Sequence, residues 1–82
     1  ALEWAKYGIR VNSLAPGYMR TDINKEFIDS DMSNDMIKRI PMRRVGSIDE
    51  MDGALLLLVS DAGSYITGST LIVDGGHLLR DL

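Results

Sequence analysis

The chain has 82 residues, enough for one small domain, and 45% of them are hydrophobic, which is too many for a disordered protein. A net charge of −3 leaves no basic face for nucleic acid or an anionic membrane, and no apolar run approaches the roughly 20 residues of a membrane span. The absence of cysteine and the single histidine exclude disulfides, thiolate metal sites and a His-rich metal site. The absence of cysteine also fits a cytoplasmic protein, which is the location we expect.

A helix end and a strand come first in chain order. Residues 1–8, ALEWAKYG, are typical of the last two turns of a helix with Gly8 at its C-terminal stop. Because the chain starts inside that helix and lacks an initiator methionine, we expect a fragment or a processed piece. The alternation of apolar residues over 9–15 then predicts a strand, which Pro16 ends because proline has no N–H.

The loop PGYMRT, residues 16–21, follows the carboxyl end of this predicted strand. Hairpins prefer Asn-Gly or Asp-Gly, so a simple chain reversal explains Pro16-Gly17 poorly. Ligands of open α/β sheets bind beyond the carboxyl ends of the strands. Gly17 would allow the backbone to approach a ligand, the backbone groups of Tyr18 and Met19 would be free to pair with a planar amide, and the Thr21 hydroxyl can donate and accept. An ordinary Pro-Gly loop without a ligand is the alternative.

Residues 22–42 predict two short amphipathic helices around the polar stretch DSDMSND. The first contains Phe27 and begins after Thr21 or Asp22 as N-cap, and the second contains Met36. Such a broken pattern indicates a mobile flap, with a plain surface excursion as the alternative.

Ser47 and Glu50 form the capping-box pattern S-x-x-E, which predicts a helix over 47–60. The end of this helix, ALLLLV, is apolar nearly all round and implies a second packing surface, either another subunit or parts of the same fold. Residues 69–74 form a continuous β-prone run that is typical of a strand covered on both faces. Gly75-Gly76 is expected to end that strand with no helix after it.

A strand, broken helices, a long helix and a second strand predict an α/β protein with two parallel strands joined by a helical crossover. The segments GIRVNSLAPGYMRT, IPMRRVG, SIDEMDGALLLLVSD and SYITGSTLIVDGG, in this order, closely resemble the C-terminal third of the classical short-chain dehydrogenase/reductase family. The resemblance covers almost the entire chain, and the residues of these motifs are most similar to those of the gluconate and polyol branch. It implies the C-terminal β-α-β portion of a doubly wound Rossmann sheet, with NAD or NADP as cofactor and an alcohol or ketone as substrate.

The resemblance also implies roles for individual residues. Pro16, Gly17 and Thr21 match the motif beside the nicotinamide, where the backbone at the position of Met19 holds the carboxamide. Residues 22–42 match the substrate flap. Candidates for lining the substrate cleft are Tyr18, Phe27 and Met36, with ordinary packing as the alternative.

The family's catalytic serine and Tyr-x-x-x-Lys match nothing in this chain, because they lie upstream of its first residue in the family pattern. No catalytic residue is therefore assigned, and the 82 residues alone are not expected to be active. We favour a helix cap for Asp22 and a surface position for His77. A dimer or tetramer through the 47–60 helix and the last strand is expected. A truncated, non-catalytic oligomerisation or binding module of the same fold is the alternative.

Overall fold

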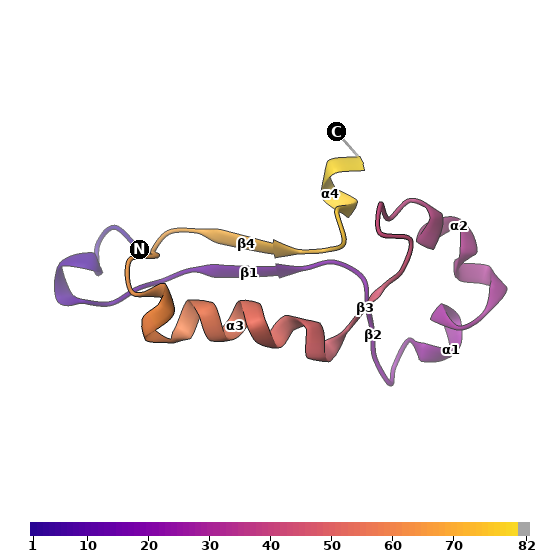
Figure 1. The fold of residues 1–82 in the computed structure, drawn as a ribbon, viewed down its shortest axis with the longest axis horizontal. Helices are drawn as coiled ribbons and strands as arrows, with labels where there is room; N and C mark the ends of the chain where they lie inside the picture. The colour runs from indigo at the N-terminus through magenta and orange to yellow at the C-terminus, as the bar shows by residue number, and fades with distance from the viewer. Residues whose placement is uncertain (81–82) are drawn as a thin grey trace.

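The computed structural model describes residues 1–80 and shows a pair of parallel strands with one helix along it and a group of short helices beyond the strands' carboxyl ends (Figure 1). The strands are β1 (Ser13–Pro16), β2 (Met19–Arg20), β3 (Gly46–Ser47) and β4 (Thr70–Val73). The α-helices are α1 (Lys25–Ile28), α2 (Asn34–Lys38), α3 (Asp52–Val59) and α4 (His77–Arg80). Short 3₁₀ turns occupy Ala5–Tyr7, Asp31–Ser33, Ile48–Met51 and Asp61–Gly63.

β1 and β4 pair in parallel, from Ser13 opposite Thr70 to Pro16 opposite Val73, which confirms the predicted parallel arrangement. The predicted strand over 9–15 nevertheless began too early. Residues 9–12 face the loop 66–69, in which Gly68 has a φ of +76° and donates its N–H to the carbonyl of Val11 at 2.8 Å. A loop with a left-handed residue cannot continue the regular ladder, so the strand begins at Ser13.

The strand predicted over 69–74 is likewise shorter, because β4 covers only Thr70–Val73. At each of its ends a side chain, rather than the neighbouring strand, accepts a backbone N–H. The N–H of Ser69 donates to Asn12 Oδ1 at 2.9 Å, while Asp74 turns to the residues after it. Ile72 is 44% exposed, so within the described residues β4 is not covered on both faces as predicted.

At the start of the chain, the predicted two-turn helix end is only the 3₁₀ turn Ala5–Tyr7. The predicted C-terminal stop at Gly8 is confirmed, because Gly8 has a φ of +77° and donates its N–H to Ala5 O. Trp4 and Tyr7 remain mostly exposed, so no apolar burial supports a longer helix here.

The helix predicted over 47–60 forms as the 3₁₀ turn Ile48–Met51 followed by α3, and the capping box is present. Glu50 Oε1 accepts the N–H of Ser47 at 3.0 Å. At the other end, the Arg10 guanidinium donates to the carbonyl of Leu58 at 2.7 Å. A cation on the last carbonyls of a helix stabilises that end.

The buried side chains of the described residues all lie in the predicted flap: Ile28, Ser33 and Ile40. Ser33 Oγ lies 2.7 Å from the carbonyl of Ile28, so the only buried hydroxyl has a partner among the described residues. The two short helices and the polar break are as predicted, but the N-cap of α1 is Asn24 rather than Thr21 or Asp22. The flap thus has a small core of its own.

The expectation that no helix follows Gly75-Gly76 was wrong, because α4 begins directly after them. Both glycines have positive φ, which lets the chain turn back so that the Asp74 carboxylate accepts the N–H groups of Gly76 and Leu78 at 2.8 and 2.9 Å.

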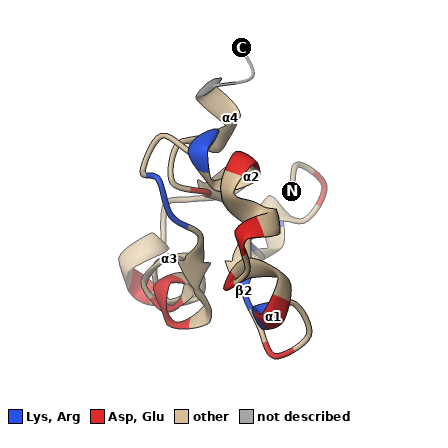
Figure 2. Ribbon diagram, turned by 90° about the vertical axis from the view of Figure 1, so that its right-hand side faces the viewer, with Lys and Arg blue, Asp and Glu red and all other residues tan. Residues whose placement is uncertain are grey.

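Viewed from the flap end, α1 and α2 each carry acidic and basic positions, whereas the start of α3 carries only acidic ones (Figure 2). No helix in the described part of the chain is long and apolar enough to cross a membrane.

Candidate functional site

The predicted ligand loop leaves β1 at its carboxyl end and continues directly into β2, which pairs in parallel with β3. The register places Met19 opposite Gly46, and the carbonyl of Tyr18 accepts the Gly46 N–H at 2.9 Å. The Tyr18 carbonyl, expected to be free, therefore already accepts one hydrogen bond, as the Met19 carbonyl also does, and each keeps its second lone pair. This pairing fixes the course of the loop.

Gly17 allows the loop to pack closely against Asp74, directly after β4. A Cβ at this position would lie 2.6 Å from Asp74 Cβ and 2.8 Å from Asp74 Cα, distances that real Cβ atoms do not adopt. Pro16 lies within β1 opposite Val73, and the Gly17 N–H still donates to Val73 O at 2.9 Å, so the strand ends one residue later than predicted. Glycine is thus required for packing this loop against the end of β4.

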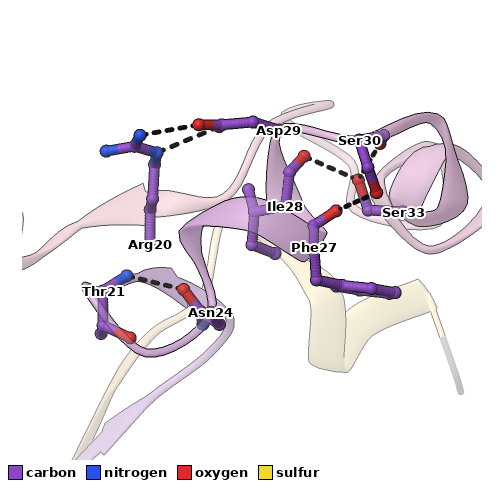
Figure 3. Close-up of polar contacts among 8 residues, drawn as sticks. All are labelled: Arg20, Thr21, Asn24, Phe27, Ile28, Asp29, Ser30 and Ser33. Atoms are coloured by element: carbon purple, nitrogen blue, oxygen red, sulfur yellow. Dashed lines mark hydrogen bonds and ion pairs between the residues drawn. The ribbon is translucent and has the colours of Figure 1, made fainter.

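Met19 and Thr21 meet at the side chain of Asn24, which the sequence reasoning missed. Asn24 Nδ2 donates to the Met19 carbonyl at 2.8 Å. Asn24 Oδ1 accepts the Thr21 N–H at 2.7 Å (Figure 3). The spacing Thr-x-x-Asn is the signal that could have revealed it, since asparagine often bonds to nearby backbone.

The chemistry of this loop suits a planar carboxamide. Among the described residues no hydrogen bond uses the Thr21 hydroxyl, which can donate and accept. The Met19 carbonyl has a second lone pair beyond the one that Asn24 uses. A carboxamide offers one acceptor and two donors, so it matches these groups.

The three predicted cleft residues lie on different elements. Phe27 is in α1 and 43% exposed, and Met36 is half-buried in α2. Tyr18 lies between β1 and β2, with its ring centroid 5.3 Å from that of His77 in α4. His77 is half-buried by this contact rather than a simple surface residue, and Tyr18 faces α4.

A cavity of about 130 Å³ opens beside the loop, where β2, β3 and the end of β4 meet. Its lining residues are Tyr18, Met19, Met42, Arg44, Gly46, Glu50, Val73, Asp74 and Gly75.

Both carboxylates of this cavity are held in the ionised form. Arg44 donates to the two oxygens of Glu50 at 2.6 and 2.8 Å and, with the Ser47 N–H, lowers the pKa of Glu50 from 4.5 to about 2. The N–H groups of Leu78 and Gly76 lower the pKa of Asp74. Carboxylates engaged in this way are poor proton-transfer groups near neutral pH, so the cavity is suited to binding rather than acid–base catalysis.

Within residues 1–80, no group of side chains of the ligating types could hold a metal ion.

Comparison with known proteins gives consistent results. A family model described as "Enoyl-(Acyl carrier protein) reductase" matches residues 1–77. The chain is 46% identical to D-arabinitol 2-dehydrogenase [ribulose-forming] of Candida tropicalis over 80 residues, covering 94% of this chain and 28% of that protein.

Two solved structures share the fold. A gluconate 5-dehydrogenase from Burkholderia cenocepacia, in complex with NADP and tartrate, is 43% identical with a TM-score of 0.84, covering 95% of this chain and 31% of that one. A 4-hydroxyisoleucine dehydrogenase complexed with NADH is 32% identical with a TM-score of 0.88, covering 96% and 33%.

The chain thus spans about a third of the length of the relatives that it matches. The family match over nearly all of its residues, with the parallel α/β arrangement, shows that the chain belongs to the short-chain dehydrogenase/reductase family of oxidoreductases.

Proposed function

We propose that this chain is the C-terminal portion of an NAD(P)-dependent oxidoreductase that interconverts a secondary alcohol and a ketone on a sugar acid, polyol or similar small hydroxy compound. Its contribution is the nicotinamide side of the cofactor site and the substrate flap. The observation that carries this proposal is the Asn24 side chain, which binds both the Met19 carbonyl and the Thr21 N–H in the loop at the carboxyl end of a parallel strand.

The C-terminal position is supported by the connection that leaves β1. In a Rossmann sheet the first strand leads into a Gly-rich turn that opens a helix and binds the pyrophosphate. Here β1 leads through Pro16-Gly17 into β2 instead. The strand pair therefore suits a later part of the sheet, after the phosphate-binding turn and after the catalytic Tyr-x-x-x-Lys.

The cofactor, when bound, supplies the hydride chemistry. This chain's residues would bind and orient it: Met19 and Thr21 hold the carboxamide, and Pro16-Gly17 shape the loop. Tyr18, Phe27 and Met36 are the flap-side candidates for substrate contact. Closure of residues 22–42 over the substrate would exclude water and fix the approach of the reacting atoms.

The relatives support the substrate class by their names, an arabinitol dehydrogenase and a gluconate dehydrogenase. The exposed apolar residues of α3 support a homo-oligomer, a dimer or tetramer through α3 and β4, and they equally favour the alternative of a non-catalytic oligomerisation module. The two proposals differ in whether Thr21 affects a cofactor.

The test is a chimera in which residues 1–82 replace the segment that they match in the Burkholderia gluconate 5-dehydrogenase. We expect the chimera to bind NADP and to oxidise gluconate or arabinitol. Thr21→Ala should raise the KM for NADP, whereas Thr70→Ala, an exposed threonine without a side-chain hydrogen bond among the described residues, should not. A chimera that folds but binds no NADP, or that prefers an enoyl thioester to hydroxy compounds, would overturn the proposal.

A further inference from the structure

The Asn24 side chain holds two peptide groups of the nicotinamide loop at once. Its Nδ2 donates to Met19 O, and the Oδ1 of the same amide accepts the N–H of Thr21, the contact that Figure 3 shows. Met19 O belongs to the peptide plane before Arg20, and Thr21 N to the plane after it. One side chain therefore restricts both backbone dihedrals of Arg20 and sets the direction in which Thr21 leaves the strand.

Only an amide fits both partners. The Thr21 N–H requires an acceptor and the Met19 carbonyl requires a donor, and the asparagine amide presents one of each. A carboxylate of the same shape would satisfy Thr21 but would place a second oxygen against the Met19 carbonyl. This complementarity also fixes which way the Asn24 amide is oriented.

A second contact reaches the same segment from α1. Arg20 donates through Nε and Nη2 to the two oxygens of Asp29 at 3.0 and 2.7 Å (Figure 3). Both side chains are about half exposed, at 50% and 56%, and exposed ion pairs contribute little. The Asn24 bonds are partly buried, so they are the stronger restraint on the loop.

We propose that Asn24 is a positioning residue for nicotinamide binding: its amide holds the Met19 carbonyl and the Thr21 backbone in the geometry that presents the Thr21 hydroxyl to the carboxamide. The inference rests on the proposed function and adds a residue outside the Pro-Gly…Thr motif. Asn24 does not itself touch the cofactor in this scheme; it acts through Met19 and Thr21.

The experiment uses the same chimera and two probes: NADP, and 2′-phospho-ADP-ribose, which lacks the nicotinamide. Asn24→Ala removes both hydrogen bonds, and the isosteric Asn24→Asp removes only the donor. Each variant is expected to bind NADP about tenfold more weakly, since two partly buried hydrogen bonds or their geometry are lost. Binding of 2′-phospho-ADP-ribose should not change, and the KM for NADP should rise more than kcat falls.

Asn34→Ala is the matched control, because Asn34 is exposed at the start of α2 and its side chain makes no hydrogen bond among the described residues. Asn24 variants that bind NADP like the parent would overturn the inference, and so would variants that lose both probes equally, which would indicate a general structural role. Failure of the proposed function looks different: the parent chimera binds no NADP, or Thr21→Ala has no effect on it.

Discussion

Dilution of the purified 82-residue chain is expected to unfold it, because its conformation leaves too much surface exposed for a stable monomer. The structure exposes 6302 Å², whereas a compact protein of 9.1 kDa exposes about 4,900 Å². Its radius of gyration is 15.7 Å, against about 12 Å for a compact domain of this length. The excess surface is therefore about 1,400 Å².

This excess is large on the scale of protein stability. With somewhat more than half of it apolar and about 25 cal/mol per Å², the missing burial corresponds to about 20 kcal/mol. A typical domain is stable by only about 5–15 kcal/mol, so a single copy in this conformation lacks the burial it needs. Exposed side chains of α3, among them Leu56 at 61% and Val59 at 66%, are where a covering surface would bind.

Circular dichroism and light scattering over a dilution series measure this directly. We expect the helical signal to fall as the associated species disappears. Leu56→Lys should shift that loss to higher concentration, whereas Tyr65→Lys, an exposed position outside α3 and β4, should not. A sharp two-state melt of a monomer whose midpoint is independent of concentration would refute the reasoning.

Three further predictions concern the chimera. Gly17→Ala should lower the melting temperature and weaken NADP binding, because its Cβ would lie 2.6 Å from Asp74 Cβ; Gly53→Ala meets nothing within 4 Å and should stabilise by about 0.5–1 kcal/mol. Glu50→Gln should melt below the parent at neutral pH, and because the folded pKa is depressed to about 2 from 4.5, that difference should shrink as the pH falls from 4.5 towards 2. Arg10→Ala should lose about 1–3 kcal/mol in urea unfolding, since the carbonyls of Leu58 and Ser60 lose the guanidinium as a donor and that of Ile66 keeps only Asn12 Nδ2.

Each of these predictions has a contrary result. A Gly17→Ala enzyme that melts with the parent would contradict the packing of the loop against β4. A difference between Glu50→Gln and the parent that grows at low pH would contradict the sign of the Glu50 effect. An Arg10→Lys enzyme as stable as the parent would show that the planar guanidinium is not needed, because lysine keeps the charge but lacks its fixed fork of N–H donors.

The parts of the fold that the sequence predicted are those with a local cause. The capping box at Ser47, the glycine stop at Gly8 and the parallel strand pair each follow from residues within a few positions or from the order of elements. The strand bounds were less accurate because they depend on the segment opposite: Gly68 in the facing loop delays β1 until Ser13.

At the candidate site, residue types alone predicted the position of the loop but not the hydrogen bonds that fix its conformation. That Tyr18 O pairs with β3 depends on a strand of two residues which no periodicity indicates. That Asn24 reaches back to Met19 depends on the same pairing, since β2 sets where the loop turns. α4 was missed because Asp74 accepts N–H groups across two glycines of positive φ.

The distribution of buried residues explains how the loop of residues 16–21 can remain ordered although the neighbouring strands β1 and β4 are partly solvent-exposed. The flap buries Ile28 and Ile40, the latter close to Gly75, and the loop is held by hydrogen bonds from β3 and from Asn24 rather than by a covering sheet. The strands and α3, by contrast, expose their apolar residues and depend on a surface beyond the described residues. Under the proposed function, association and nicotinamide binding should therefore respond to different substitutions: those on α3 should change association, while those at Asn24 and Thr21 should change only the cofactor end.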